Sequence, residues 1–371
     1  MKVAVLGGGM AGVSIAYELS ATTDVLLLER EAQLALHTTG RSAAMYLESY
    51  GNPTVRGLTA ASRGDFDRLQ HILDTSRLLT PRPLLWVADS DADSVSRLDA
   101  VVVAGARRLD ADEARELWPA LRPGRVTAAA VDDDAMEIDV LGLHQGYVRG
   151  LRARGGEIVR SASGTVRREG GGWCVGTGSG EVTVDVVVDA GGAWADEIAA
   201  GAGVRPVGLR PLRRTLFTCP VEWPTPIDGW PMLADVAERW YLKPESGGQV
   251  LASPADETPS EPCDARPDPL DVARALDDLH DTVQLGLRSV RSSWAGLRTF
   301  APDRSPVVGY PADAPGFFWF AGQGGYGIQM APALARVGAA LVQDGDLPED
   351  VAARGVTTSA LHPDRAPVPL S

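Results

Sequence analysis

The N-terminal stretch contains the feature that most restricts the folds open to this chain. A short apolar strand is expected from Val3 to Leu6, and it leads into the turn Gly7 to Gly12, which has the form GxGxxG. An amphipathic helix follows from about Met10 to Ser20, and a second apolar strand, Val25 to Leu28, ends at Glu29. This order of elements is that of the βαβ unit that binds dinucleotides. It predicts an α/β fold built on a parallel sheet.

Each glycine of the turn has a separate physical task. Gly7 lets the chain turn tightly, Gly9 lets the backbone approach a pyrophosphate, and Gly12 lets the helix pack close to the strand. The helix N-terminus offers free N–H groups to phosphates, and Glu29 can accept hydrogen bonds from ribose hydroxyls. A glycine-rich turn without a ligand is the alternative, but the strand, helix and acid together favour dinucleotide binding.

A second strand followed by a glycine-rich turn lies near the other end of the chain. Phe317 to Phe320 is an aromatic strand that runs into Ala321 to Gly327, and a helix is expected from about Ile328 to Gln343. Two such turns, far apart in sequence, suit a long cofactor. Its adenosine end would meet the first turn and its ring end the second.

The middle of the chain mixes helical and strand patterns. Helices are expected at Thr59 to Leu73 and Leu141 to Arg154. The apolar run Val182 to Val188, followed by Asp189 to Trp194, predicts a strand that returns to the sheet beside the first one. The segment Pro254 to Pro269 is rich in proline and acids and predicts an exposed loop.

Length, charge and cysteine usage narrow the class of protein. With 371 residues, two or three domains of ~150 residues are expected. A formal net charge of −14 makes nucleic acids and anionic membranes poor partners. Cys174, Cys219 and Cys263 form no CxxC pair, so neither a metal site nor a disulfide framework is expected. Without a leader or an apolar run of ~20 residues, we expect a soluble, cytoplasmic protein with no transmembrane segment.

Five stretches, in order along the chain, carry a resemblance to a known family: His37–Ala44, Leu143–Tyr147, Tyr241–Pro244, Trp294–Arg298 and Gly322–Gln329. With them the chain resembles the D-amino-acid oxidase/glycine oxidase/sarcosine oxidase superfamily of FAD amine oxidoreductases, and within it the bacterial D-arginine dehydrogenase type. The resemblance implies a discontinuous Rossmann-type FAD-binding domain from residues 1–50, 140–210 and 290–371. Residues 51–139 and 211–289 would form a substrate-binding domain with a mixed sheet.

The resemblance also implies which residues bind FAD. The pyrophosphate would lie on the Gly7–Gly12 backbone, the ribose on Glu29 and the adenine on Val166. The Gly324–Gln329 turn would place N–H groups and a helix dipole at the flavin N1–C2=O edge, where negative charge develops on reduction. The full implied set is Gly7, Gly9, Met10, Ala11, Gly12, Glu29, Arg30, Thr39, Gly40, Arg41, Ser42, Ala43, Ala44, Val166, Ala190, Gly191, Trp194, Gly324, Gly325, Tyr326, Gly327, Ile328 and Gln329.

Substrate residues follow from the chemistry that the family performs. Oxidation of an amino acid moves a hydride from Cα to flavin N5, so orientation matters more than acid–base help. A bidentate arginine best holds the carboxylate, and Arg298 matches the family's carboxylate arginine. The resemblance implies Arg298, Tyr50 and Tyr241 as catalytic residues, and Arg214, Met45, Leu84, Gly325 and Tyr326 as further substrate contacts.

The departures from the D-arginine dehydrogenase pattern concern the substrate side chain. That pattern has an acid after Pro-Arg-Pro, whereas Leu84 follows Pro81–Pro83 here, and the pocket histidine of the pattern is Met45. A buried guanidinium without a charge partner is unfavourable. With Trp86 nearby, the pocket is expected to prefer an apolar or small side chain.

Two further departures concern the flavin. Monomeric sarcosine oxidases attach FAD through a cysteine, and an ungapped comparison puts Gly296 at that position, so noncovalent FAD is expected. The lysine that promotes their reaction with oxygen is replaced by Ala252 in a similar comparison. This replacement favours a dehydrogenase over a fast oxidase.

The sequence therefore predicts an FAD-dependent D-amino-acid dehydrogenase or oxidase that acts on a free amino acid with an uncharged side chain. One alternative is a glycine or N-methyl amine oxidase, or an enzyme of a specialised pathway. A second is an FAD-binding subunit without activity of its own. The D preference comes from the resemblance alone. The sequence specifies neither the electron acceptor, which could be oxygen or a quinone-like molecule, nor the oligomeric state.

Overall fold

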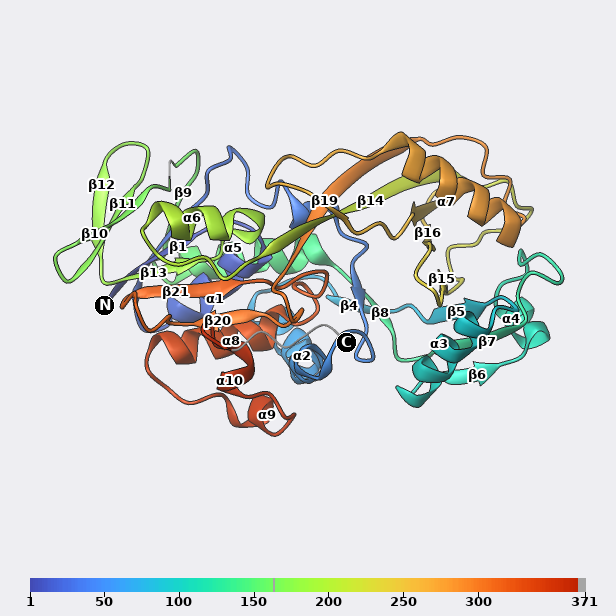
Figure 1. Ribbon diagram of the computed structural model, residues 1–371, viewed down its shortest axis with the longest axis horizontal. Coiled ribbons are helices and arrows are strands. Elements are labelled where there is room, and N and C mark those ends of the chain that lie inside the picture. Colours follow the sequence, from blue (N-terminus) through green and yellow to red (C-terminus); the bar gives the residue numbers. More distant parts are fainter. Residues whose placement is uncertain (163, 366–371) are drawn as a thin grey trace.

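The computed structural model describes residues 1–162 and 164–365, and one half of it is built on a six-stranded sheet. The strand order is β20–β21–β13–β1–β2–β9, in which all neighbours are parallel except β20, which is antiparallel to β21 (Figure 1). The strands are β1 (Lys2–Leu6), β2 (Asp24–Leu28), β9 (Glu157–Val159), β13 (Val186–Asp189), β20 (Val307–Gly309) and β21 (Phe317–Ala321). The predicted α/β, Rossmann-type fold is confirmed.

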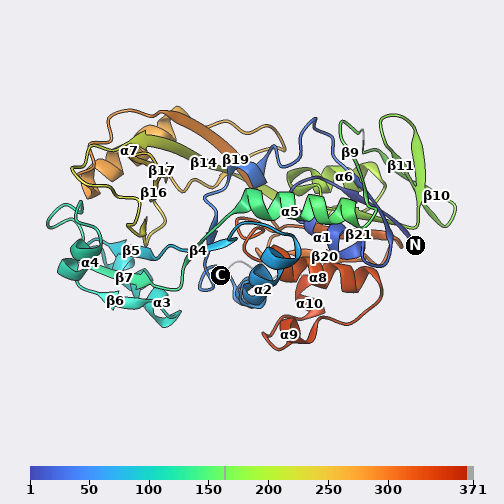
Figure 2. The same ribbon diagram turned by 180° about the vertical axis from the view of Figure 1, so that it is seen from behind.

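Both faces of this sheet are covered, which explains why its strands are continuous apolar runs. Along β1, Val3 and Val5 point to one face and Ala4 and Leu6 to the other. The first face carries α1 and α5, which lie side by side, and α8, on which α2 packs (Figure 2). These helices are α1 (Met10–Leu19), α2 (Pro53–Ile72), α5 (Val140–Ala153) and α8 (Ala331–Val342), and the short α9 (Glu349–Ala352) and α10 (Thr358–Leu361) follow them. The second face carries α6 (Ala195–Gly201) and the sheet of β10 (Val166–Glu169), β11 (Gly172–Gly176) and β12 (Glu181–Val184).

The other half is built on a nine-stranded, mostly antiparallel sheet. Its order is β18–β14–β17–β16–β15–β5–β7–β6, and β19 pairs with β14. The strands are β5 (Leu84–Ala88), β6 (Arg107–Leu109), β7 (Ala128–Asp132), β14 (Arg210–Pro220), β15 (Met232–Asp235), β16 (Tyr241–Glu245), β17 (Gln249–Ser253), β18 (Thr258–Pro259) and β19 (Ser292–Phe300). One face packs on α7 (Pro269–Thr282) and α4 (Ala111–Leu117), and α3 (Ala92–Val103) lies beside β5 and β7.

Alternation along the strands decides which side chains leave this sheet on its second face. On β5, Leu85 and Val87 enter the core beneath α7, so Leu84 and Trp86 point the other way. That second face is turned toward the Rossmann-type half. A small sheet of β3 (Met45–Tyr46), β8 (Met136–Ile138) and β4 (Leu79–Pro81) lies at the junction of the two halves.

Two elements cross the domain boundaries that were expected from the sequence. Helix α2 falls in the segment expected to belong to the second domain, yet its Leu58 and Phe66 lie in the core under α8. Strand β19 falls in a segment expected to belong to the first, yet it pairs along its length with β14. The boundaries themselves stay a prediction.

The expected elements are mostly present, with differences at their ends. The helix expected from Thr59 begins earlier, at Pro53, where the Asn52 side chain accepts a hydrogen bond from the Val55 N–H at 3.0 Å. The run Val182–Val188 does return to the sheet beside β1, as expected, but the prediction of a single strand is wrong. The run forms two strands, because Asp185 leaves the ladder and its carboxylate accepts the Lys2 N–H at 2.7 Å.

Two C-terminal expectations also need adjustment. The helix expected from Ile328 begins at Ala331, because the preceding residues continue the glycine-rich turn. The expected exposed loop, Pro254 to Pro269, contains the short strand β18. It also contains the buried carboxylate of Asp256, which accepts hydrogen bonds from the Thr215 N–H and hydroxyl at 2.6 and 2.9 Å.

A buried carboxyl at the end of β13 makes stability depend on pH. Asp189 is fully buried, and burial raises its pKa to about 8 although it accepts the Gly191 N–H at 3.0 Å. Between its ordinary pKa of 3.8 and about 8, this group holds a proton in the folded chain but not in the unfolded chain. Its contribution to the free energy of unfolding therefore falls as pH rises through that window.

Asp189→Asn should therefore become progressively more stable than the unmodified protein as pH rises from about 4 to about 8. The amide keeps the acceptor for Gly191 and cannot ionise. Thermal unfolding of both proteins across this pH range measures the difference. A difference in midpoint that does not change with pH would contradict the assignment.

Candidate active site

A cavity of about 560 Å³ lies between the carboxyl ends of β1, β2 and β13 and the second face of the nine-stranded sheet. Most of the residues expected at the site line it. These are Gly7, Gly9, Met10, Ala11, Glu29, Arg30, Thr39, Arg41, Ser42, Ala43, Ala44, Met45, Tyr50, Leu84, Val166, Ala190, Gly191, Trp194, Arg214, Tyr241, Arg298, Gly324, Gly325, Gly327, Ile328 and Gln329. Gly12, Gly40 and Tyr326 are not among the lining residues.

The N-terminal glycine turn brings backbone to one end of the cavity. Gly7 has a φ of +108°, and a Cβ there would lie 2.4 Å from the Ala190 carbonyl oxygen. A Cβ at Gly12 would lie 1.8 Å from the Gly7 oxygen, so Gly12 packs the helix on the turn behind the cavity wall. Gly9 is the N-cap of α1 and offers no side-chain cap. The helix therefore presents backbone N–H groups to the cavity.

The end of β2 supplies a fixed carboxylate and a cation. Glu29 is buried, and its two oxygens accept the Gly8 N–H at 2.7 Å and the Glu31 N–H at 2.8 Å. These bonds orient the carboxylate and leave lone pairs for a ligand hydroxyl. The Arg30 guanidinium lies 4.4 Å above the Trp194 ring, on the opposite wall.

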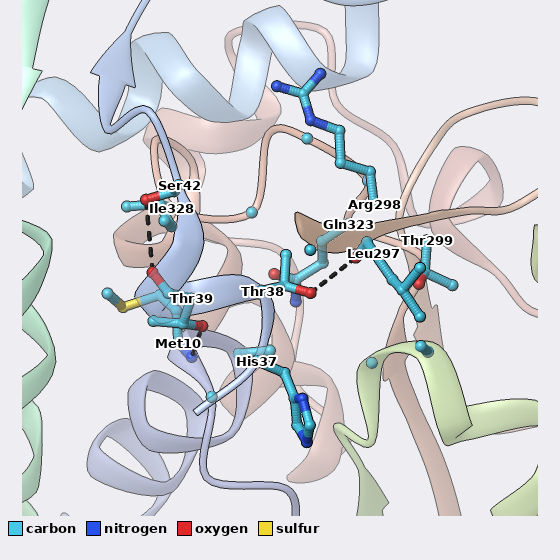
Figure 3. Close-up of a pocket in the computed structure, with 18 of the residues that line it drawn as sticks. Met10, His37, Thr38, Thr39, Ser42, Leu297, Arg298, Thr299, Gln323 and Ile328 are labelled. Carbon is cyan, nitrogen blue, oxygen red and sulfur yellow. Dashed lines mark hydrogen bonds between the residues drawn. The ribbon is translucent and has the colours of Figure 1, made fainter. Parts of the chain in front are cut away.

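The loop before β3 crosses the middle of the cavity and is tied to both halves (Figure 3). Thr39 accepts the Met10 N–H at 2.9 Å, and the Thr38 hydroxyl donates to the Leu297 carbonyl at 2.8 Å. Both threonines lie in the 3-10 turn η1 (Thr38–Arg41). Gly40 lies behind it, where a Cβ would be 2.5 Å from the Ala35 oxygen.

Arg41, in the same turn, is committed to protein oxygens. Its Nη1 donates to the Ala295 carbonyl at 2.8 Å, and its Nη2 donates to Asp264 at 2.6 Å. Its Nε donates to the Leu36 carbonyl at 3.1 Å. These bonds hold the 264–265 loop against η1 and weigh against the FAD contact that was expected of this guanidinium.

The C-terminal glycine turn forms the wall nearest Arg298. A Cβ at Gly325 would lie 2.9 Å from the Arg298 guanidinium carbon, so a larger residue there would displace this side chain from its present position. Gly324 has a φ of +55°, and a Cβ there would lie 2.1 Å from the Phe300 ring. Tyr326 lies behind the turn, with its ring 5.0 Å from that of Tyr50.

Gln329 ties the same turn to the chain that follows β3. Its amide oxygen accepts the Leu47 N–H at 3.2 Å, and its amide nitrogen donates to the Leu47 carbonyl at 3.3 Å and to the Thr59 hydroxyl at 3.0 Å. The side chain is 4% exposed. Its amide is therefore occupied by protein groups and positions this wall of the cavity.

Arg298 brings an unpaired positive charge into the cavity. Its Nη1 is buried and has no hydrogen-bond partner among the described residues. Burial lowers the pKa of Arg298, but the hydroxyls of Tyr50 and Tyr241 outweigh burial and the net shift is upward. The buried hydroxyl of Tyr241 also lacks a partner among the described residues. Two unpaired polar groups side by side, one cationic, form a site for a carboxylate.

Arg214 also reaches the cavity wall, but its charge is balanced. Its Nε donates to the Asp256 carbonyl at 2.9 Å, and its Nη2 lies 3.3 Å from a Glu257 oxygen. Glu257 is also held by both Nη groups of Arg304, at 2.8 and 3.0 Å. Burial raises the pKa of Glu257, but Arg304, Arg214 and Arg298 lower it further, and the net shift is downward. Arg214 thus lies on the cavity wall, but its guanidinium is held by protein oxygens.

An apolar cluster closes the far end of the cavity. Leu84 is 1% exposed and packs with Met232, Ala234 and Tyr241, and Met45 joins this group from β3. The sequence did not single out Leu47, Met232, Ala234, Trp240, Thr299 and Gln323, which also line the cavity. Strand alternation could have placed Met232 and Ala234 on one face, but not shown which face met the site.

Comparisons with known proteins agree with this geometry. The model of the family described as "DAO: FAD dependent oxidoreductase" matches residues 2–341. The chain belongs to this family. It is 24% identical to a glycine oxidase of Bacillus licheniformis, over 91% of this chain and 92% of that one. It is 26% identical to a D-amino acid dehydrogenase of Cereibacter sphaeroides, over 98% and 97%. The crystal structure of glycine oxidase from Geobacillus kaustophilus superposes with a TM-score of 0.81 at 21% identity, over 96% and 98%.

The protein is therefore an FAD-dependent amine or amino-acid oxidoreductase of the DAO family, and its cavity fits the cofactor. The glycine turns open backbone at both ends of the cavity, and Glu29 supplies the carboxylate that a ribose needs. Unpaired buried polar atoms also gather on its walls. Among the described residues they include Thr299 Oγ1 and Gln323 Nε2, beside Arg298 Nη1 and Tyr241 OH. Such groups need partners, and a polar cofactor and substrate supply them.

The structure corrects one comparison made from sequence. Ala252 is fully buried in the core beneath α7, on the face of the sheet turned away from the cavity. It therefore does not occupy a position over a flavin ring. No lysine lines the cavity, because the chain has only Lys2 and Lys243 and both lie elsewhere. Lys243 is held by Glu137 and Glu245.

Residues 1–162 and 164–365 contain neither a membrane-spanning helix nor a cluster of metal-ligating side chains. No helix there is long and apolar enough to cross a membrane. No group of three or more His, Cys, Asp or Glu side chains there is arranged to hold a metal ion.

Proposed function

We propose that the protein oxidises the Cα–N bond of a free D-amino acid with an uncharged side chain to the imino acid, using noncovalently bound FAD. The observation that carries the proposal is Arg298, whose buried Nη1 has no partner among the described residues and lies between Tyr50 and Tyr241. The assignment of the D enantiomer is supported by the resemblance to D-amino acid dehydrogenases.

The residues around Arg298 orient the substrate. The guanidinium binds the carboxylate in a two-pronged contact, and the Tyr241 hydroxyl donates a further hydrogen bond to it. Tyr50 closes the site from the loop side. FAD supplies the hydride acceptor when bound. The protein's part is to hold Cα in line with that acceptor and to exclude water.

The side-chain preference rests on the apolar cluster. Leu84, Met232 and Ala234 present apolar side chains to the cavity, and none of the three is an acid. Burying apolar surface against them contributes roughly 25 cal/mol per Å². An arginine or lysine side chain would bury a charge there without a partner.

A glycine or N-methyl amine oxidase is the second candidate. The bulk of Met45, Leu84 and Met232 across from Arg298 favours it, because such bulk would exclude larger side chains. The relationship to a glycine oxidase adds support.

Anaerobic flavin reduction by a panel of D- and L-amino acids, glycine and sarcosine tests the proposal. We expect uncharged D-amino acids to bleach the flavin fastest. Preference for glycine or sarcosine would select the second candidate. A flavin that no amino acid reduces would leave an FAD-binding subunit without activity of its own.

The purified protein should be yellow and should release FAD on acid or heat denaturation. None of the three cysteines, all of them among the described residues, lines the cavity, and Gly296 lies where a covalent link was considered. Absorbance of the supernatant after precipitation measures the release. Flavin that stays with the precipitated chain would contradict noncovalent binding.

The electron acceptor is proposed to be something other than oxygen. The arginines that line the cavity are committed: Arg30, Arg41 and Arg214 are paired with acids, and Arg298 is assigned to the substrate carboxylate. A free lysine, which would stabilise the charge that develops when oxygen is reduced, is not among the described lining residues. Slow reoxidation by air and fast reoxidation by a quinone would support this assignment.

A further inference from the structure

The indole of Trp86 occupies a distinct place on the cavity wall. On β5 it faces the same side as Leu84, and its strand neighbours are Ala234 on β15 and Ala130 on β7. Both neighbours are small, so the indole has room between them. In the sheet, β15 and β16 separate β5 from β17, β14 and β19 (Figure 1). Trp86 is thus on a strand remote from β19 in the sheet order, and it packs in the apolar cluster that also contains Tyr241.

The N–H of this indole is a buried donor without an acceptor. Trp86 Nε1 is inaccessible to solvent and has no hydrogen-bond partner among the described residues. Two other buried indoles have acceptors: Trp118 donates to the Pro231 carbonyl at 2.9 Å and Trp173 donates to the Pro315 carbonyl at 3.2 Å. Trp294 and Trp319 are also unpaired, but neither lines the cavity.

A buried unpaired donor is unfavourable unless a ligand completes it. The groups around the indole do not do so: Leu84 and Ala234 offer only hydrocarbon side chains, and the Met232 thioether is a weak acceptor that makes no bond to it. The two acids near this end are also unsuitable. Asp235 is held by Arg239 at 2.7 and 2.8 Å, and Glu238 is exposed.

We propose that Trp86 is a specificity-determining residue, and that the substrate is an amino acid whose elongated, uncharged side chain carries a hydrogen-bond acceptor at its far end. The stem of the side chain lies against Leu84, Met232 and Ala234, and the acceptor receives the Trp86 N–H. This inference rests on the proposed function, since it assumes that Arg298 holds the carboxylate.

Two pairs of amino acids that differ only in the acceptor test it. D-Phenylalanine is compared with D-4-pyridylalanine, at mildly alkaline pH where the pyridine nitrogen is unprotonated. D-2-Aminoheptanoate is compared with the γ-methyl ester of D-glutamate. The measured quantity is the rate constant of anaerobic flavin reduction divided by the dissociation constant. In at least one pair, the member with the acceptor should be preferred by about tenfold or more.

Trp86→Phe keeps an aromatic ring and removes the N–H, so the preference, taken as the ratio within each pair for the same variant, should fall to near unity. Trp319→Phe is the matched control: it also removes an unpaired buried indole N–H, but outside the cavity, so the preference should not change. Trp86→Leu serves as a second variant without the donor if Trp86→Phe does not retain flavin.

Equal or greater reduction by the apolar member in both pairs would overturn the inference. So would a preference that persists in Trp86→Phe or Trp86→Leu. Either result leaves the proposed function standing, because the apolar amino acids would still reduce the flavin. Failure of all amino acids, including the simple ones of the panel, would instead show that the proposed function is wrong.

Discussion

Replacing Arg298 by lysine should slow flavin reduction by an uncharged amino acid about tenfold or more and raise the concentration needed for half-maximal reduction. Lysine keeps the charge but loses the planar, two-pronged contact with a carboxylate. A loss of alignment worth ~1.4 kcal/mol in the transition state is a factor of ten in rate. Anaerobic stopped-flow measurement of flavin bleaching separates the rate from the dissociation constant.

The size of this effect follows from how tightly the site is built around the guanidinium. A Cβ at Gly325 would lie 2.9 Å from its carbon, and the hydroxyls of Tyr50 and Tyr241 complete its surroundings. A lysine ammonium at the end of a flexible stem cannot reproduce these contacts. Removing the guanidinium also leaves the buried substrate carboxylate without its two-pronged donor.

Arg336→Lys is the matched control for this experiment. Arg336 is another largely buried arginine, held by Asp65 at 2.9 Å and Asp350 at 2.6 Å, and it does not line the cavity. Its replacement should leave flavin reduction unchanged. Unaltered reduction kinetics in Arg298→Lys, or an equal loss in both variants, would place the carboxylate site elsewhere.

The Rossmann-type half could be predicted because its signals are local. The turn Gly7 to Gly12 follows a fixed spacing in which Gly12 packs on the Gly7 carbonyl, and buried parallel strands read as apolar runs. The same reasoning failed at Val182–Val188. There a carboxylate bound to the N–H of Lys2, distant in sequence, separates two strands that share one apolar pattern.

The pairing of charges at the site could not be predicted, because each partner comes from a distant segment. Arg41 is held by a loop at 264–265, and Arg214 shares Glu257 with Arg304. Sequence alone presents these three arginines as equivalent cations. The resemblance singled out Arg298, and the folded chain shows the physical difference, since its Nη1 is left unpaired among the described residues.

Only some members of the apolar cluster could be predicted from the sequence. Leu84 and Met45 stood out as departures from a family pattern, but Met232 and Ala234 carried no such mark. Ala252 was placed by counting residues, and a count cannot tell which face of a strand a residue occupies. In the structure it points into the core beneath α7.

Leu84→Glu should change the order of substrates. In the unmodified protein, D-arginine should reduce the flavin more than a hundredfold less efficiently than the best uncharged amino acid, since a mismatch of ~3 kcal/mol corresponds to such a factor. In the variant, D-arginine and D-lysine should gain and apolar amino acids should lose. Leu84→Met, which keeps the hydrocarbon, should leave the order unchanged.

The surroundings of Leu84 explain this change of order, because the residue is 1% exposed and meets Met232 and Ala234. A carboxyl placed there has no cation among these neighbours, so burial raises its pKa and favours the neutral form in the empty pocket. A guanidinium that enters the pocket reverses this balance, because the ion pair stabilises the ionised carboxylate. Binding of D-arginine to Leu84→Glu should therefore release an additional proton to the buffer, beyond the proton that oxidation of any amino acid releases. Clear preference for D-arginine in the unmodified protein would mean that another acid supplies the charge, and an unchanged order in the variant would mean that residue 84 does not meet the substrate.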